Sequence, residues 1–287
     1  MMEKYLGFVA VSVFLLSCAE AERNNPYDEL AVNYIWKSSA EGSSSSVKAG
    51  INEPSSSSAP LSSSNVVPSS SSLAAASSSS SRPPSSSSSF VSQNGVVYGT
   101  PVDYEGQTYQ TVVIGTQTWM AKNLNYNATG SKCYGGVDSN CNTYGRLYDW
   151  STAMGFGSSC NSNTCSSQVQ PNHRGVCPPG WHIPSDAEWS TLETAVGGSY
   201  TAGTKLKAKS GWNDYNGASG NGTDDYGFSA LPGGSGLSGG YFNFVGDLGN
   251  WWSATEGYSS FMRCDDDAYY QGLSDKGYLF SVRCVQD

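Results

Sequence analysis

The distribution of apolar residues divides the chain into parts of different character. An apolar run from Tyr5 to Leu16 lies close to the first residue, whereas residues 38–93 consist largely of serine runs broken by Pro, Ala and Val. From about residue 94 onwards, apolar positions return in short stretches separated by glycine-rich turns. Because only this last part can bury a sizeable apolar surface, we expect one folded domain at residues 94–287.

Local patterns in this domain predict a hairpin and two helices. TVVIGTQTWMA (111–121) has strand-type residues around a turn and predicts a β-hairpin. Apolar residues at helical spacing predict a short helix within residues 144–154. The clearest predicted helix lies in residues 184–198, where Ser185 is a fitting N-cap and Glu188 completes a capping box. Its expected inward face consists of Ala187, Leu192, Ala195 and Val196.

Short strands are expected after these helices. The stretches YGFSALPGG, NWWSATE, DDAYYQGL and YLFSVRCV, between residues 226 and 285, are separated by glycine-rich loops. A chain with few helices and many short strands, without a regular strand–helix alternation, favours the α+β class.

The first residues predict export and lipidation. The apolar run is too short to span a bilayer but long enough for a signal peptide. It ends in LLSC (15–18), which resembles the bacterial lipobox, in which the cysteine is lipidated. We therefore expect a lipoprotein signal peptide at residues 1–17, a segment at 18–37 lipidated on Cys18, and a membrane anchor in the bacterial outer membrane, at the cell surface. An ordinary signal peptide cleaved elsewhere is the alternative.

Composition adds a linker and excludes one class of partner. Residues 38–93 cannot bury enough apolar area to offset the entropy of ordering, so they are predicted to be a disordered Ser/Pro-rich linker. This linker would serve as a stalk, with or without glycosylation, or as a passive spacer. The net charge of −9 disfavours nucleic acid, whose phosphates require a basic surface.

The cysteines indicate disulfide bonds. An exported protein reaches an oxidising compartment, and seven cysteines follow Cys18. Short loops favour local pairing, so we expect the bonds Cys133–Cys141 and Cys160–Cys165. A zinc site is disfavoured because no CxxC occurs and neither histidine has ligand spacing from a cysteine pair.

Several sequence blocks resemble a known family. In order, they are TQTWMAKNLNY, YGRLYDW, GVCPPGWHIPSDAEW, DDYGFSALPGG, WWSATE and FSVRCVQD. Together they resemble the Fibrobacter succinogenes major paralogous domain, a family of secreted bacterial modules similar in fold to C-type lectin-like and formylglycine-generating-enzyme-like domains. The resemblance implies short helices flanking irregular antiparallel sheets. It also implies the bond Cys177–Cys284, which leaves Cys264 free; Cys264–Cys284 is the rival pairing.

Candidate chemistry is weak in most places. His182 could act as a base or a ligand, but its position before a capped helix favours a packed histidine bonded to backbone. An oxidase activity like that of formylglycine-generating enzymes would need a reactive cysteine pair, whereas the cysteines here look structural. Three adjacent acids repel one another unless they are solvated or bound to a cation, which leaves calcium as an open alternative at Asp265, Asp266 and Asp267.

Aromatic residues are the remaining candidates. Flat exposed rings suit stacking on sugar faces, and if the adjacent tryptophans lie in a strand, one should face inwards and one outwards. The expected ligand-binding residues are Trp251, Trp252, Tyr241, Tyr258 and Tyr269. The alternative is that most of these rings belong to the core.

The sequence therefore predicts a non-enzymatic, lipid-anchored surface protein. Its domain would bind a polysaccharide or a partner protein through loops between about residues 211 and 270. A structural cell-envelope protein without a small ligand is the first alternative, and a hydrolase that uses the acidic loop is the second.

Overall fold

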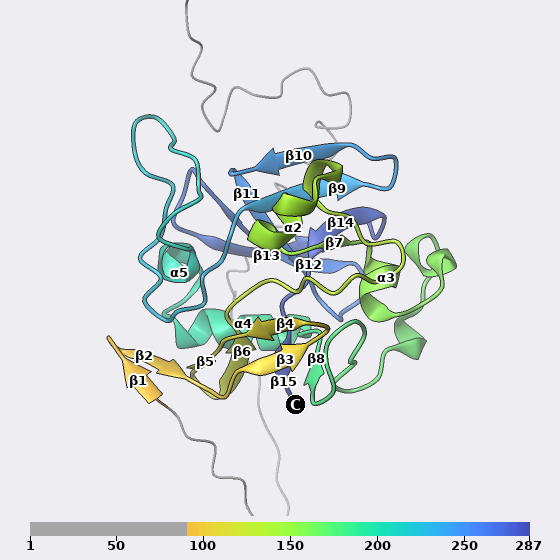
Figure 1. Cartoon of the computed structure of the whole chain (residues 1–287), viewed down its shortest axis with the longest axis horizontal. Helices are drawn as coiled ribbons and strands as arrows, with labels where there is room; N and C mark the ends of the chain where they lie inside the picture. The colour runs from red at the N-terminus through yellow and green to blue at the C-terminus, as the bar shows by residue number, and fades with distance from the viewer. Residues whose placement is uncertain (1–90) are drawn as a thin grey trace, which may run out of the picture.

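The computed structural model describes residues 91–287, whose strands form two main sheets and one short hairpin (Figure 1). The six-stranded sheet contains, in spatial order, β1 (Val91–Gln93), β2 (Val96–Tyr98), β5 (Thr111–Ile114), β6 (Gln117–Met120), β15 (Val285–Gln286) and β8 (Trp181–His182). The separate hairpin pairs β3 (Val102–Tyr104) with β4 (Gln107–Tyr109). The six-stranded sheet thus holds both the first and the last strand of the described residues.

The second sheet has seven strands. Its main order is β10 (Phe242–Val245), β9 (Gly233–Leu237), β14 (Tyr278–Ser281), β11 (Leu248–Trp252), β12 (Tyr258–Arg263) and β13 (Tyr269–Leu273). The seventh strand, β7 (Leu147–Tyr148), pairs with β14. Most pairs are antiparallel, while β11 makes single parallel pairings with β14 and β9. This order leaves β10 at one edge of the sheet.

Short helices connect the strands. The α-helices are α2 (Asp138–Tyr144), α3 (Trp150–Met154), α4 (Asp186–Ala195) and α5 (Ser199–Leu206), and the 3₁₀ turns are η1 (Tyr134–Gly136), η2 (Ser158–Asn161) and η3 (Ser166–Gln168). The α+β class is confirmed. None of the helices among residues 91–287 is long and apolar enough to cross a membrane.

The local predictions succeed where short-range signals are strong. The hairpin is β5–β6, and α4 has the full capping box: the Ser185 hydroxyl accepts from the Glu188 N–H, and the Glu188 carboxylate accepts from the Ser185 N–H. The predicted inward face of α4 is partly wrong. Ala187 and Ala195 are exposed, and Trp189 packs inwards with Leu192 and Val196.

Other boundaries differ from the prediction. The helix expected within residues 144–154 is confined to α3, because Asp149 caps it by accepting from the Thr152 N–H and β7 occupies the residues before it. Helix α5 was missed, since Gly203 interrupts its pattern and leaves room for the main chain at Ala268. Residues 226–232 form no strand.

Both faces of β11, in the middle of the second sheet, are covered. Trp251 and Trp252 alternate as expected for neighbours in a strand, but Trp251 packs in one apolar cluster with Trp189 and Met262, and Trp252 packs in the other with Tyr148. Both tryptophans are fully buried. The expectation that one of them faces outwards is therefore wrong.

A buried arginine near the end of the chain binds residues from earlier segments of the domain. Arg283 donates to the Asn123 side-chain oxygen, 3.1 Å from Nε and 2.6 Å from Nη2, and to the Met120 and Phe228 carbonyls. The same Asn123 oxygen accepts from Trp251 Nε1 at 2.8 Å. Burial lowers the pKa of Arg283 to about 9. These contacts explain why the terminal FSVRCV stretch is central to the fold.

The three predicted disulfide bonds are confirmed: Cys133–Cys141, Cys160–Cys165 and Cys177–Cys284. The prediction that Cys264 carries a free thiol is wrong, because no cysteine among the described residues is free. Its rival pairing with Cys284 is excluded because Cys284 is bonded to Cys177.

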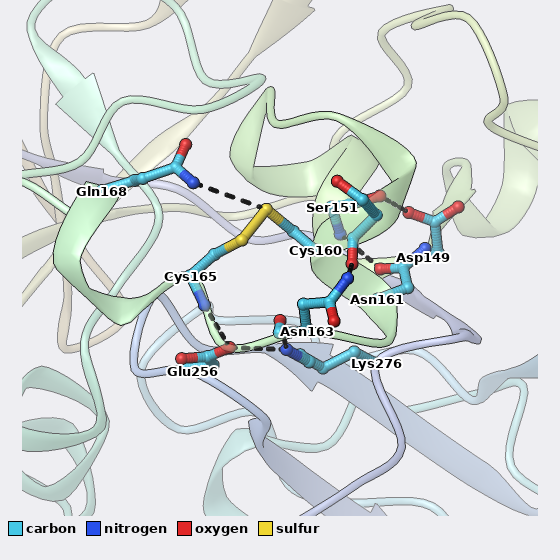
Figure 2. The surroundings of a disulfide bond; sticks show 10 residues. Asp149, Ser151, Cys160, Asn161, Asn163, Cys165, Gln168, Glu256 and Lys276 are labelled. Atoms are coloured by element: carbon cyan, nitrogen blue, oxygen red, sulfur yellow. Dashed lines mark hydrogen bonds and ion pairs between the residues drawn. A yellow bond between two sulfur atoms is a disulfide. The ribbon is translucent and has the colours of Figure 1, made fainter.

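Figure 2 shows how the Cys160–Cys165 loop is held on the domain. The Cys165 N–H donates to Glu256 Oε1 at 2.8 Å, and Lys276 Nζ lies 2.5 Å from the same oxygen. Lys276 Nζ also donates to the Asn163 carbonyl at 2.7 Å. The charges of this pair are mostly shielded from water. Besides its own disulfide, the loop is therefore held to the turns that precede β12 and β14.

The predicted N-terminal features lie outside the described residues. These features are the signal peptide (1–17), Cys18, the segment 18–37 and nearly all of the linker (38–93). Only the last three residues of the predicted linker are described, and they form β1. The first strand therefore begins three residues before the predicted start of the domain at residue 94.

Candidate functional site

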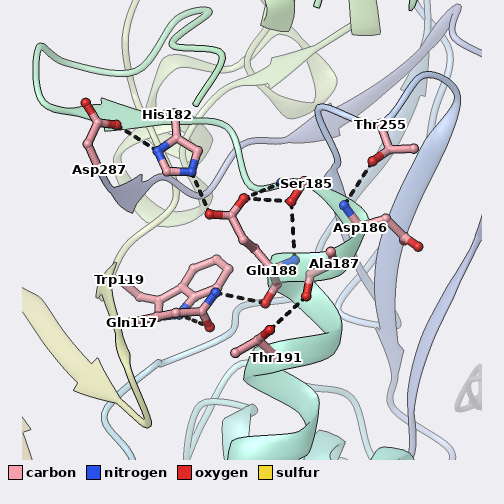
Figure 3. A network of polar contacts seen from close by, with 10 residues as sticks. All are labelled: Gln117, Trp119, His182, Ser185, Asp186, Ala187, Glu188, Thr191, Thr255 and Asp287. Atoms are coloured by element: carbon pink, nitrogen blue, oxygen red, sulfur yellow. Dashed lines mark hydrogen bonds and ion pairs between the residues drawn. The ribbon is translucent and has the colours of Figure 1, made fainter. Parts of the chain in front are cut away.

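His182 is the centre of a buried polar network (Figure 3). Strand β8 places its ring between the start of α4 and the end of β15, where Nε2 lies 2.8 Å from Glu188 Oε1 and Nδ1 lies 2.8 Å from Asp287 Oδ1. The His182 side chain is almost fully buried. It is packed, as the sequence suggested, but the expected backbone partners are wrong because two carboxylates occupy its ring nitrogens.

The two carboxylates favour a charged imidazole. Burial disfavours the imidazolium, but the hydrogen bonds and charges of Glu188 and Asp287 outweigh burial and raise the pKa of His182 above its usual value of 6.5. Burial also opposes ionisation of Glu188, yet its bonds to His182 and Ser185 lower its pKa. The network is thus an ion triad that joins β8, α4 and β15.

A cleft of about 350 Å³ adjoins this network. Its lining includes both histidines of the chain, together with Ser185, Glu188 and Thr255. His173 Nε2 lies 2.8 Å from the Met154 carbonyl, and its Nδ1 lies 3.3 Å from the Gln170 N–H. Because each ring nitrogen of both histidines already has a protein partner, the cleft presents no free imidazole nitrogen for base catalysis or metal binding.

The side chains of Asp265 and Asp266 in the acidic loop are bound by other side chains of the protein. Asp265 forms a two-point ion pair with the Arg263 guanidinium, and Asp266 accepts from the Tyr270 hydroxyl at 2.6 Å. The Tyr270 pKa rises to about 12 through burial and this bond. Among residues 91–287 there is no group of three or more His, Cys, Asp or Glu side chains that could hold a metal. The geometry of Asp265, Asp266 and Asp267 therefore gives no support to a calcium site.

A buried lysine explains why three aspartates lie next to one another in the acidic loop. Lys207 is only 2% exposed, and its Nζ donates to the Asp266 carbonyl at 2.8 Å and to the Arg263 carbonyl at 3.1 Å. Burial lowers the pKa of Lys207, and the charges of the three aspartates oppose that shift. The triplet thus offsets a buried positive charge of the same domain.

Three of the five predicted aromatic contacts are unavailable to a ligand. Trp251, Trp252 and Tyr269 are all buried in the core, Trp252 in one apolar cluster and Trp251 and Tyr269 in the other. Tyr258 is half-buried at the start of β12, paired with Leu273. Only Tyr241 is strongly exposed, at 72%. The structure therefore moves the candidate site to the hairpin formed by β9 and β10.

This hairpin has an unusual surface. Residues 233–245, GGSGLSGGYFNFV, contain no charged side chain. Tyr241 lies between the two strands, and Phe242 contacts Tyr134 of η1 with ring centres 5.4 Å apart. Neighbouring residues of an extended strand face opposite sides, so the Tyr241 side chain points away from the Phe242 ring that Tyr134 contacts. We call Tyr134, Tyr241 and Phe242 the aromatic hairpin residues. Figure 1 shows α2, which directly follows η1, beside β9 and β10 and at the opposite end of the domain from α4 and β15.

Sequence reasoning missed Tyr134. The Cys133–Cys141 pairing places it in a small closed loop, but no local signal connects this loop with a hairpin far along the chain. That connection arises only because η1 packs against β9 and β10.

The comparisons agree with the sequence blocks. A family model described as the Fibrobacter succinogenes major domain matches residues 112–286. The chain belongs to this family. No curated protein and no solved structure matches it.

The matched region contains all the candidate functional residues described above except Asp287. It runs from the second residue of β5 to the end of β15, and it includes the aromatic hairpin residues, the acidic loop and His182. Strands β1 to β4 precede the match, and Asp287 follows it. The family description states no ligand or activity, so the function has to be argued from the surface itself.

Proposed function

We propose that this major-domain protein is a non-enzymatic recognition module that binds polysaccharide at the bacterial surface. The observation that carries the proposal is the exposure of Tyr241 on a hairpin without charged residues. An exposed ring offers a large, rigid contact area for the apolar face of a sugar, while its hydroxyl stays hydrated. The engaged ring nitrogens of both histidines and the ion pairs of the acidic loop support a role without catalysis.

The proposal includes the anchor and the finer fold classification. The LLSC motif at residues 15–18 supports lipidation of Cys18 and an outer-membrane location, with residues 38–93 as a stalk. A C-type lectin-like arrangement is supported by the short helices and by the presence of β1 and β15, the first and last described strands, in one sheet.

Binding of the full-length protein to soluble polysaccharides, measured by affinity electrophoresis and calorimetry, tests the function. We expect saturable binding that Tyr241→Ala weakens roughly tenfold, the equivalent of one aromatic contact. Tyr200→Ala is the matched control, because Tyr200 is 88% exposed but lies on α5. Equal losses in both variants, or no binding to any polysaccharide, would refute the proposal. Co-purification of an envelope protein without glycan binding would favour a structural role.

A further inference from the structure

The cleft beside His182 is built from three segments that lie far apart in the sequence. Its lining comes from the loop 169–173, from residues 182–188 at the end of β8 and the start of α4, and from residues 254–255 after β11. Its volume of about 350 Å³ lies at the lower end of the range found for small-molecule sites. The cleft is therefore large enough for a small molecule but not for a folded partner.

Hydrogen bonds hold the three segments to one another. The Ile183 N–H donates to the His173 carbonyl at 3.1 Å, which joins the first segment to the second. The Ala254 N–H donates to the Pro184 carbonyl at 2.8 Å, which joins the second segment to the third. The His173 ring also packs on Phe156, with ring centres 4.9 Å apart. Because the walls are held in place before a ligand arrives, binding loses little free energy to ordering the protein.

The polar groups that remain unused in the cleft are two amides and a hydroxyl. Among residues 91–287, the Asn172 side chain has no hydrogen-bond partner. Gln170 donates once, to the Gln168 carbonyl at 3.4 Å, so its side-chain oxygen is unpaired. Thr255 Oγ1 accepts from the Asp186 N–H at 3.0 Å, so its hydroxyl proton is available to a ligand (Figure 3). These groups offer both donors and acceptors, and none of them carries a charge.

The charged groups in the lining are already paired. Glu188 and His182 lie 2.8 Å apart, and the second carboxylate oxygen of Glu188 accepts from the N–H and the hydroxyl of Ser185. Charged residues that adjoin the lining in the sequence have both signs: Arg174, Asp186 and Glu256, the last paired with Lys276. A ligand anion needs a free cation and an ammonium group needs a free carboxylate, and the lining provides neither, so an uncharged ligand is favoured.

Apolar side chains complete the cleft. They include Val169 and Pro171 on the loop and Ala254 on the third segment. Apolar walls with a few unpaired polar groups are typical of sites for small organic ligands. A sugar ring matches this combination, because its hydroxyl groups both donate and accept hydrogen bonds while its C–H groups contact apolar atoms.

From this geometry we propose that the cleft beside His182 binds a single uncharged sugar unit, hydrogen-bonded by Gln170, Asn172 and Thr255. The unit can be a free sugar or the end of a glycan, since both present the same hydroxyl groups. The proposal is independent of the polysaccharide contact at Tyr241, because Figure 1 shows β9 and β10 at the opposite end of the domain from α4 and β15.

Calorimetric titration of the full-length protein tests this site. The uncharged probes are glucose, galactose, mannose, xylose and cellobiose, and the competing classes are glucuronate, glucosamine and glycylglycine. We expect at least one uncharged sugar to bind with a dissociation constant on the order of 1 mM. Asn172→Gly and Thr255→Val should each weaken this binding about threefold to tenfold, the effect of one hydrogen bond.

The controls match these substitutions. Asn172 has a φ of +50°, which glycine adopts without strain, so Asn172→Gly removes only the side chain. Asn216 is also exposed and has a φ of +49°, but it lies outside the cleft. Asn216→Gly should therefore bind as the unchanged protein does, and so should Thr255→Ser, which keeps the hydroxyl.

The outcomes separate this site from the proposed function. Tighter binding of cellobiose than of glucose supports a glycan end as the ligand, and equal binding supports a free sugar. The inference is wrong if no uncharged sugar binds at millimolar concentration, if a charged probe or glycylglycine is preferred, or if Asn172→Gly and Thr255→Val bind normally. Sugar binding that only Tyr241→Ala weakens would also overturn it, while the recognition function would stand. Absence of polysaccharide binding with intact cleft binding would overturn the recognition function alone.

A second measurement needs no variant. In ¹⁵N–¹H spectra of the unchanged protein, the bound sugar should cause its largest shifts in residues 169–173, 182–188 and 254–255. Largest shifts in the hairpin at residues 233–245, or anywhere else outside the cleft, would show that the sugar binds at another place.

Discussion

Removal of the His182 side chain is the sharpest test of the ion triad. In His182→Ala, two 2.8 Å contacts to carboxylates disappear, and a gap bordered by the two carboxylates replaces a nearly buried ring. The triad joins β8 to both α4 and β15, so its loss weakens the connection between the central helix and the last strand. We expect a folded but clearly destabilised protein.

The magnitude follows from the contacts. A hydrogen bond to a charged group contributes about 1.5–3 kcal/mol, so two of them set an upper range of about 3–6 kcal/mol. The Glu188 and Asp287 side chains are 30% and 45% exposed, so water can solvate both carboxylates again after the ring is removed. This solvent screening reduces the expected loss of unfolding free energy to about 2–4 kcal/mol.

The loss should depend on pH in a defined direction. The pKa of His182 is raised in the folded state, so its contribution is complete below its usual value of 6.5 and disappears as the pH rises through the folded value. The pKa of Glu188 is lowered from 4.5, so its contribution is present above 4.5 and is lost as the pH falls through the folded value. The triad therefore contributes most between about pH 5 and 6.5.

Urea unfolding followed by tryptophan fluorescence from pH 4 to 9, with the disulfides intact, measures this contribution. The difference between the unchanged protein and His182→Ala should peak in the weakly acidic range and decrease above it. His182→Gln keeps hydrogen-bonding capacity but no charge, so its stability should lie between those of the other two proteins, and its own stability should lack the part of the pH dependence that His182 supplies. A loss below about 1 kcal/mol, or one that grows as the pH rises, would refute the ion-triad interpretation.

Three further outcomes are expected. Replacing Cys177 and Cys284 by serine should cost roughly 5 kcal/mol in urea unfolding, because the bond joins residues 107 apart; a loss under about 2 kcal/mol would contradict the chain-entropy argument. EDTA should shift the thermal midpoint by less than about 1 °C, since Asp265 and Asp266 already bind protein donors; calorimetry that shows a rise of several degrees with calcium would reverse this. Trp252→Phe should destabilise by about 2 kcal/mol through lost packing and the lost bond to the Tyr148 carbonyl, with polysaccharide binding unchanged; a stable variant that no longer binds would restore Trp252 as a contact.

Some features of this protein were determined by the sequence itself. The hairpin β5–β6 and the capping box of α4 depend on residues within a few positions of one another, so the pattern contains all the required information. The two short disulfide loops are local in the same sense. The family blocks additionally implied Cys177–Cys284, a pairing that no local pattern indicates.

The candidate site was only partly predictable. Tyr241 was named from its glycine-rich surroundings, and it is exposed. Trp251 and Trp252 had equally suggestive surroundings and are buried, because packing on both faces of the second sheet, rather than the alternation along β11, decides their exposure.

Tertiary structure decided the remainder, because it brings together residues that no short pattern connects. It places Tyr134 against Phe242 over glycines of β9, and it encloses His182 between Glu188 and Asp287. It also gives the acidic triplet its internal cations, Arg263 and Lys207. Local propensities fix which segments become strands and helices, whereas burial and charge pairing depend on which segments meet, and that is a property of the whole folded chain.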